Sequence, residues 1–254
     1  MCKSSKILFS INNFHFAAYN NLVEEITITQ NGYDCLYMSY LYGKVRDRFS
    51  FLPSVCDIKR QGDSTAIAFK TEKEYCPYVR KFTEDHIADV ITVGYKYAFF
   101  EKRLRLPLLS KLQKRLLLTA LVAADYKEDR GFVIRRLRGF DSYCLDGFFH
   151  FRLRDLKKRW EEVAEYIPTD MGESSLENFL GFLSEDGEGK LYVKDGKVYD
   201  EEYRPLSKSL LTGVESTVGE IVLGGAEQIF CFGNLDEETK RFLKKYYGEN
   251  AVFC

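Results

Sequence analysis

Apolar residues recur at intervals of four or three positions between residues 145 and 167. This spacing constrains the fold more than any other pattern in the chain. The residues are Leu145, Phe149, Leu153, Leu156, Trp160, Val163 and Ile167. An α-helix places such positions along one stripe, and that stripe has to be buried against another element. The spacing therefore predicts one long helix over residues 145–167, ended by Pro168, that packs through an apolar seam.

The segments around this helix are also predicted to be helical. A helix beginning near Glu74, with Pro77 in its first turn, should continue past Phe100 until Pro107 breaks it. Residues 108–125 have one apolar face, and Ser110 is a candidate N-cap for this second helix. Residues 128–138 and 173–184 predict two further helices.

Strand patterns occupy the two ends of the chain. Residues 6–11 and 64–70 predict strands, whereas residues 34–43 fit either a strand or a helix. Asp195-Gly196 predicts a hairpin between residues 190–193 and 197–199. Gly224-Gly225-Ala226 predicts a second hairpin, between residues 220–223 and 228–232. An amphipathic helix over residues 236–247 and a final edge strand at residues 251–253 complete the pattern.

Together these elements predict an α+β fold: a central antiparallel helical bundle flanked by a β-rich N-terminal part and a β-hairpin/helix C-terminal part. The predicted secondary structure changes from mainly strands to helices near residue 73 and back to strands near residue 186. These changes divide the chain into residues 1–73, 74–186 and 187–254. One compact domain could contain all three parts, and whether the two β-rich ends form one sheet stays open.

Charge is distributed very unevenly over the chain. Residues 102–159 carry sixteen Lys and Arg against six carboxylates, a net charge of +10, whereas residues 160–254 carry a net charge of −11. Two interpretations follow. The acidic last third could neutralise the basic middle inside the molecule, or the basic segment could bind nucleic acid, lipid headgroups or an acidic protein. If the helices of this segment pack antiparallel, its arginines form one cluster; the candidate partner-binding residues are Arg135, Arg136, Arg138, Phe151, Arg152, Arg154, Lys157 and Lys158.

Motifs that carry catalysis or hold a cofactor are missing from the sequence. It contains no GxxxxGK[ST], GxGxxG or GxSxG, so no cofactor is expected. His86 and Asp89 are spaced to share a metal on a helix face, but one His and one carboxylate are an incomplete site. The enzyme alternative is a metal-dependent reaction that uses helix carboxylates, either Asp85 with Asp89 or Asp125 with Asp129.

Cysteine usage and hydropathy bear on location. The seven cysteines are scattered and form no CxxC, which is typical of a reducing compartment and predicts a cytoplasmic protein. The longest nearly unbroken apolar run, residues 116–124, is too short for a membrane-spanning helix, and no targeting segment is expected at the start of the chain.

Residues 146–156, DGFFHFRLRDL, resemble the Gly-Phe-x-x-Phe-Arg-Leu signature of the sporulation protein YtxC family of endospore-forming Firmicutes. The matching residues are Gly147, Phe148, Phe151, Arg152 and Leu153. The similarity centres on residues 85–200, and it implies a cytoplasmic bacterial protein linked to sporulation, with no catalytic residues to transfer. Combined with the basic segment, this predicts a non-enzymatic protein that acts through a basic helical surface.

Overall fold

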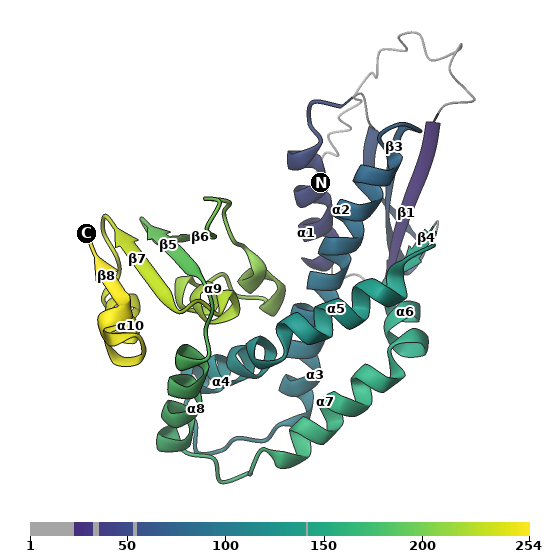
Figure 1. Ribbon diagram of the computed structural model, residues 1–254. Coiled ribbons are helices and arrows are strands. Elements are labelled where there is room, and N and C mark those ends of the chain that lie inside the picture. The colour runs from purple at the N-terminus through teal and green to yellow at the C-terminus, as the bar shows by residue number, and fades with distance from the viewer. Residues whose placement is uncertain (1–22, 33–35, 53–54, 141) are drawn as a thin grey trace, which may run out of the picture.

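The structure, a computed structural model, describes residues 23–32, 36–52, 55–140 and 142–254. It confirms the mixed α+β class, with helices joining two four-stranded sheets. In Figure 1 the two sheets lie on opposite sides of the molecule, and the helices from α3 to α8 connect them along its lower edge. The strand predicted at residues 6–11 lies outside the described residues.

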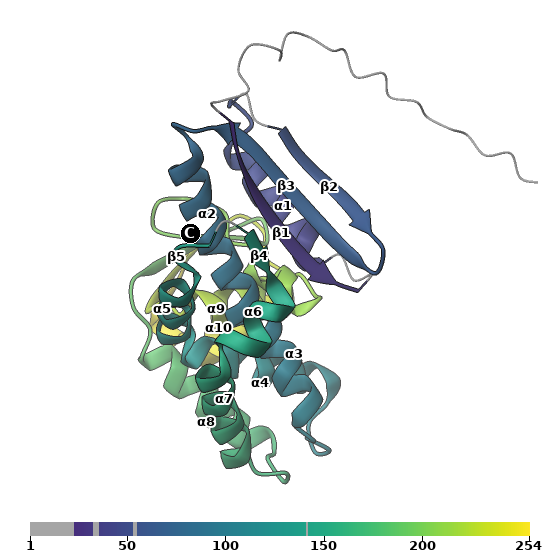
Figure 2. The same ribbon diagram turned by 90° about the vertical axis from the view of Figure 1, so that its right-hand side faces the viewer.

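The first sheet has the strand order β2-β3-β1-β4. Its strands are β1 (Val23–Asn31), β2 (Val55–Gln61), β3 (Ser64–Glu72) and β4 (Ser142–Cys144). The first three are antiparallel, whereas β4 is parallel to β1, with Tyr143 opposite Ile28. Residues 34–43, which fitted either a strand or a helix, belong in their described part to a helix, α1 (Leu36–Arg48). It lies against the sheet beside α2, as Figure 2 shows.

A single helical rod runs from α2 (Cys76–Asp89) through a π-helical segment η1 (Val90–Tyr95) into α3 (Lys96–Arg103). Pro77 lies in its first turn, and the rod ends at Arg103, before Pro107, as predicted. A π-helical turn widens the helix locally, and such turns are frequent at functional sites. In this rod, the turn falls between two charged residues, Asp89 and Lys96.

Helices α4 (Lys111–Ala124) and α5 (Tyr126–Leu137) follow. Ser110 is the N-cap of α4, as predicted. Its hydroxyl accepts the Gln113 N–H, and the Gln113 side chain accepts the Ser110 N–H in return. Because this capping box satisfies two otherwise unpaired backbone donors, it fixes the start of α4.

The prediction of one long helix over residues 145–167 is wrong in one respect. The helix is divided at Leu153 into α6 (Leu145–Arg152) and α7 (Arg154–Tyr166). The seam itself is correct, since Leu145, Phe149, Leu153, Leu156 and Trp160 are all buried. A physical reason for the division is that α6 packs against β1 and β4 whereas α7 packs against α3, and these surfaces face different ways.

The second sheet has the strand order β6-β5-β7-β8 and follows helix α8 (Glu173–Glu185). Its strands are β5 (Lys190–Lys194), β6 (Lys197–Tyr199), β7 (Gln228–Phe232) and β8 (Ala251–Phe253). The Asp195-Gly196 hairpin between β5 and β6 is confirmed, with both turn residues at positive φ. Strand β8 forms one edge, as predicted, and α10 (Glu237–Tyr246) crosses from β7 to it with Asp236 as its N-cap.

The second predicted hairpin is wrong. Residues 217–224 form a helix, α9 (Thr217–Gly224), which follows a short 3₁₀ helix η2 (Lys208–Thr212). Strands β5 and β7 are parallel, and parallel strands need a crossover connection rather than a tight turn. Gly225 has a left-handed conformation, with φ of 58°, and ends the helix at the position where glycine is favoured. The glycine pair is therefore a helix stop.

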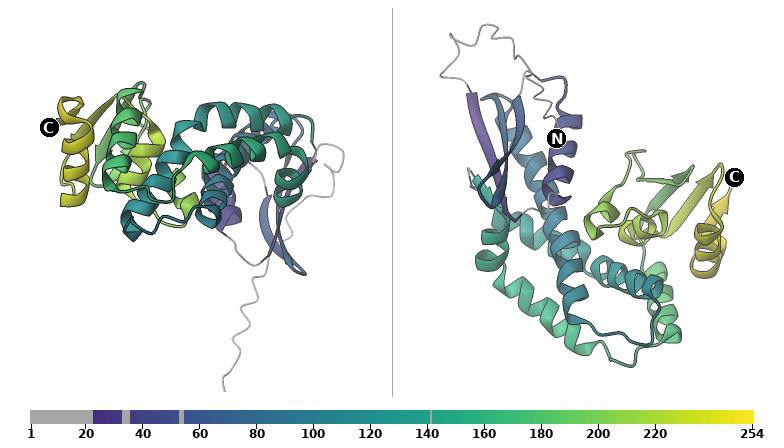
Figure 3. Two further views of the ribbon diagram at one scale, coloured as in Figure 1. Left: turned by 90° about the horizontal axis from the view of Figure 1, so that it is seen from below. Right: turned by 180° about the vertical axis from the view of Figure 1, so that it is seen from behind.

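The apolar core continues through all parts of the described chain, from Ile26 in β1 to Ala251 in β8. Strand β4 joins the first sheet, so the division expected near residue 73 is crossed by hydrogen bonds. The two β-rich ends form separate sheets. Figure 3 shows the helices α3 to α8 between these two sheets. The specific antiparallel bundle predicted for residues 74–186 is not confirmed.

Gly94 provides a test of the π-helical turn. A Cβ atom at this position would lie 2.5 Å from Cε1 of Tyr37, whose ring stacks on Tyr95 at a centroid distance of 5.2 Å. We expect Gly94→Ala to lower the free energy of unfolding by about 1–3 kcal/mol, because overpacking forces the ring or the backbone to move. Urea denaturation followed by circular dichroism measures this change.

The matched control is Gly181→Ala in α8, where a Cβ atom would meet nothing within 4 Å. This substitution should raise the free energy of unfolding by about 0.5–1 kcal/mol, because alanine has the higher helix propensity. Equal effects of the two substitutions would contradict the close packing of Gly94.

Candidate functional site

Helices α5 and α7 lie side by side and run antiparallel. Asp129, in the first turn of α5, contacts Trp160 and Arg159 in the middle of α7. Further along α5, Arg136 lies 3.5 Å from Asp155 at the start of α7. Later residues of one helix thus contact earlier residues of the other, and this arrangement brings the end of α5 close to the end of α6 and the start of α7.

Most of the residues predicted to bind a partner are exposed in this region. We call them the basic face: Arg135, Arg136, Arg138, Phe151, Arg152, Arg154 and Lys158. Arg152 lies over the ring of Phe140, with 5.5 Å between its guanidinium carbon and the ring centroid. The Phe151 side chain is 70% exposed. Lys157 differs from the others, because it is half-buried against the ring of Phe149.

Few carboxylates offset the charge of the basic face. Between residues 130 and 159, the described part of the chain contains Asp146 and Asp155. Asp146 turns toward the first sheet, where it accepts hydrogen bonds from Tyr95 Oη and from the Asn31 N–H, each at 2.7 Å. Among the described residues, two exposed carboxylates pair with the basic face: Asp155 with Arg136 at 3.5 Å and Glu162 with Lys158 at 4.0 Å.

The acidic last third leaves the basic face exposed, although α8 and α9 pack against α4. Among the described residues, three ion pairs join residues 102–159 to residues 160–254: Arg103 with Glu161, Lys127 with Glu188 and Lys158 with Glu162. Other carboxylates of the last third have basic partners nearby, as in Asp200 with Arg204 and Glu237 with Lys240. Of the two interpretations of the charge partition, the geometry therefore favours an open basic surface.

A partly buried network of charged and polar groups joins the start of α5 to the α2–α3 rod. We call it the ionic layer: Asp85, Asp89, Lys96, Asp125, Tyr126, Asp129 and Arg130. Lys96 is fully buried and donates to Asp129 at 2.8 Å and to Asp125 at 3.4 Å. The Asp129 side chain is 2% exposed and also accepts the indole N–H of Trp160 at 2.8 Å. Since a buried ion must be paired, these contacts fix α3, α5 and α7 relative to one another.

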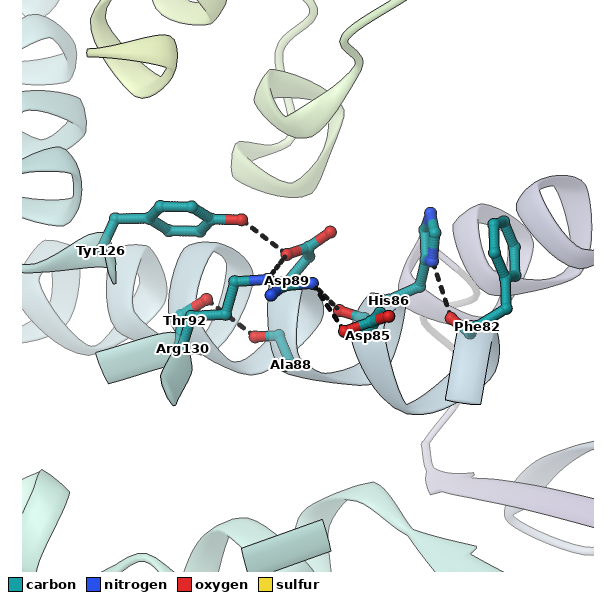
Figure 4. A network of polar contacts seen from close by, with 8 residues as sticks. All are labelled: Phe82, Asp85, His86, Ala88, Asp89, Thr92, Tyr126 and Arg130. Atoms are coloured by element: carbon teal, nitrogen blue, oxygen red, sulfur yellow. Dashed lines mark hydrogen bonds and ion pairs between the residues drawn. The ribbon is translucent and has the colours of Figure 1, made fainter. Parts of the chain in front are cut away.

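The other half of the ionic layer is shown in Figure 4. Asp89 accepts hydrogen bonds from Tyr126 Oη at 2.6 Å and from Arg130 Nε at 2.9 Å. Arg130 also binds Asp85 through Nη2 at 3.0 Å. Burial lowers the pKa of Arg130, but Asp89, Tyr126 and Asp85 together outweigh burial, and the net pKa is raised. Burial, reinforced by Asp89, raises the pKa of Tyr126.

The carboxylates considered for metal chemistry are therefore engaged by basic side chains. Arg130 binds Asp85 and Asp89, and Lys96 binds Asp125 and Asp129. Figure 4 shows His86 directed away from Asp89, with its Nδ1 atom 2.9 Å from the Phe82 carbonyl oxygen. In the described part of the chain, no group of three or more His, Cys, Asp or Glu side chains is placed to hold a metal ion.

Sequence reasoning missed three members of the ionic layer: Lys96, Tyr126 and Arg130. A signal for Lys96 was present, because its spacing of three from Val93 and four from Phe100 places it on the apolar stripe of its helix. No signal identified its partner, since the pairing with Asp129 depends on how α3 and α5 pack. Asp129 and Arg130 are adjacent in sequence and bind opposite charges on the same rod.

Replacement of Lys96 tests the ionic layer. We expect Lys96→Met to lower the free energy of unfolding by about 3–5 kcal/mol, because it leaves a buried carboxylate without its closest cation. The control is Arg103→Met, which removes the exposed pair with Glu161 and should cost less than about 1 kcal/mol. Urea titrations of the two variants and the wild type give the comparison. If both variants lower the free energy of unfolding by similar amounts, the buried Lys96 pair is no more important for stability than the exposed Arg103 pair.

His86 should make stability depend on pH. Burial lowers the pKa of this imidazole below 6.5, so the unfolded chain takes up the proton more readily than the folded one. The contribution of His86 to stability is full above about pH 6.5 and is lost as the pH falls toward the lower pKa of the folded state. The relevant charges around the ring are Asp85, Asp89 and Lys44.

The measurement is the free energy of unfolding at pH 7.5 and pH 5.5 for the wild type and for His86→Gln. The wild type should lose more stability than the variant on acidification, by at most about 1.4 kcal/mol per pH unit. A variant with the same or a steeper pH dependence would contradict a neutral buried imidazole.

The chain was compared with known proteins. No protein family, no curated protein and no solved structure matches it. In the described part of the chain, every helix is too short or too polar to cross a membrane. What the chain does has therefore to be inferred from the geometry above and from the short signature at residues 147–153.

Proposed function

We propose that this protein is a non-enzymatic binding protein and that its basic face binds single-stranded nucleic acid. The observation that carries the proposal is the composition of that face: six exposed Lys and Arg side chains around an exposed phenylalanine, paired among the described residues with two exposed carboxylates, Asp155 and Glu162. Such a surface attracts a polyanion, because Arg and Lys displace its counterions.

Phe151 favours nucleic acid over an acidic protein as the partner. The Phe151 side chain is 70% exposed beside Arg152 and Arg154, so its ring is accessible for stacking on a planar group. Proteins that bind single strands combine a basic track along the phosphates with aromatic rings on which bases stack. Double-stranded recognition fits less well, since α5 and α7 use their facing sides to bind each other rather than to enter a groove.

Packing explains some residues of the YtxC-like signature, and the remaining residues are exposed and available for binding. Phe148 and Leu153 are buried, and a Cβ atom on Gly147 would lie 3.2 Å from Sγ of Cys144. Phe151 and Arg152 are exposed, so the core does not require them. The exposed pair of the signature thus lies on the proposed binding surface.

The link to sporulation rests on this resemblance alone, and we include it in the proposal on that basis. A cytoplasmic location is supported by the cysteines, because the five that the structure describes are all free thiols. Cys76 and Cys231 are buried, and burial raises the pKa of the Cys231 thiol to about 11, as expected for structural residues.

Fluorescence anisotropy with a labelled single-stranded oligonucleotide tests the proposal. The double variant Arg138→Gln/Arg154→Gln should weaken binding at least tenfold at low salt, because two phosphate contacts are lost. Phe151→Ala should weaken binding by about one to three kcal/mol, the usual value of stacking on one base, without lowering thermal stability. Binding by the wild type should fall steeply between 50 and 200 mM salt.

The charge-matched control is Arg241→Gln/Lys244→Gln on α10, which removes two positive charges far along the chain and should leave binding unchanged. If binding falls equally in both double variants, the loss depends on net charge alone, and the proposal that the basic face binds the oligonucleotide is wrong. If the protein binds no oligonucleotide but retains an acidic protein through the basic face, the nucleic-acid proposal is wrong and the partner is that protein.

A further inference from the structure

A small pocket opens between α4 and the segment formed by η2, α9 and α10, outside the basic face. Its volume is about 160 Å³, and most of its wall is apolar. Leu112 and Leu116 come from α4, Val214 and Val218 from η2 to α9, and Phe242 from α10. In Figure 1, α4 and α9 are neighbours in the lower left of the molecule.

Small residues line the part of the pocket where α9 approaches η2. Gly219 in α9 has no side chain, and a Cβ atom there would lie 3.3 Å from Cβ of Ser209. Two apolar side chains at the pocket, Leu112 and Val214, are 53% and 38% exposed. Apolar surface left open in a concavity is typical of ligand sites.

Size limits what the pocket can hold. An apolar cavity of about 150 Å³ is large enough for one benzene molecule. A pocket of about 160 Å³ therefore accepts a single phenyl ring or a branched chain of similar bulk. A longer acyl chain would project into solvent and would gain no further contact.

The charge in the wall selects the polar part of the ligand. Arg115 lines the pocket and is half-buried, and it forms no ion pair with a carboxylate of the described residues. A partly desolvated guanidinium without an anion is a ready partner for a carboxylate, which it binds through two parallel hydrogen bonds. Glu238, the other charged residue of the wall, is exposed, so water screens its repulsion.

Ser216 adds a polar group to the wall. Its hydroxyl oxygen accepts the Gly219 N–H at 3.2 Å and caps α9. The hydroxyl hydrogen has no acceptor assigned among the described residues, so it is available to a ligand oxygen. The pocket thus combines an apolar interior with donors, which matches the usual construction of a small-molecule site.

We propose that this pocket binds a small carboxylic acid with one apolar group of phenyl or isobutyl size, held by Arg115 through its carboxylate. The site is independent of nucleic-acid binding by the basic face.

Isothermal titration calorimetry with the full chain tests the proposal, with phenylacetate and 4-methylpentanoate as probes. Both acids should bind at least tenfold more tightly than phenylacetamide, which has the same shape and no charge, because the charged hydrogen bonds are lost in the amide. Decanoate should bind no more tightly than 4-methylpentanoate. Failure of both acids to bind, or equal affinity for acid and amide, would overturn the proposal.

Three variants assign the site. Arg115→Gln should weaken phenylacetate binding at least tenfold, and Val214→Trp should abolish it by filling the mouth of the pocket. Glu238→Gln should strengthen binding slightly, because it removes a negative charge from the wall; weaker binding would contradict the assigned carboxylate. Arg138→Gln on the basic face is the control and should leave acid binding unchanged, whereas Arg115→Gln should leave oligonucleotide binding unchanged.

Discussion

The ion pair between Lys96 and Asp129 is the contact on which the rest of the structure depends. Both side chains are almost completely removed from water, and Trp160 completes the hydrogen bonding of Asp129. Such a pair contributes less to stability than to selecting one arrangement, because any shift of α3 against α5 would leave a buried charge unpaired. The position of α7, and with it the whole basic face, is therefore set by two side chains from other helices.

The position of the carboxylates explains how a chain of nearly neutral charge exposes a strongly basic surface. Asp129 and Asp146 lie within the basic segment of the sequence, yet both turn inward, one to Lys96 and the other to Tyr95 and β1. The acids that would have neutralised the surface are used to hold helices together. A formal charge summed over the sequence misses this, because it does not distinguish exposed from buried groups.

Local signals in the sequence were sufficient for much of the fold, and long-range packing decided the rest. The Ser110 cap, the Asp195-Gly196 turn and the apolar seam through Trp160 depend on neighbouring residues and were predicted correctly. The break at Leu153 and helix α9 depend on surfaces that come from distant segments, and both were missed. The sequence indicated which residues make up the basic face, but it did not show that Asp146 turns away from that face, because this depends on contacts with Tyr95 and Asn31 from distant segments.

The pairing of β4 with β1 has a consequence for the order in which the protein folds. Asn31 and Asp146, at the junction of these strands, are separated by 115 positions in the chain. Contacts between residues so far apart in the chain form late in folding, because a long loop has to close first. At translation rates of about 5–20 residues per second, the exposed edge of β1 waits on the order of 10 s for its partner strand to be synthesised. During that interval the nascent sheet presents an open edge, which makes it a natural point for chaperone engagement or for mispairing with another chain.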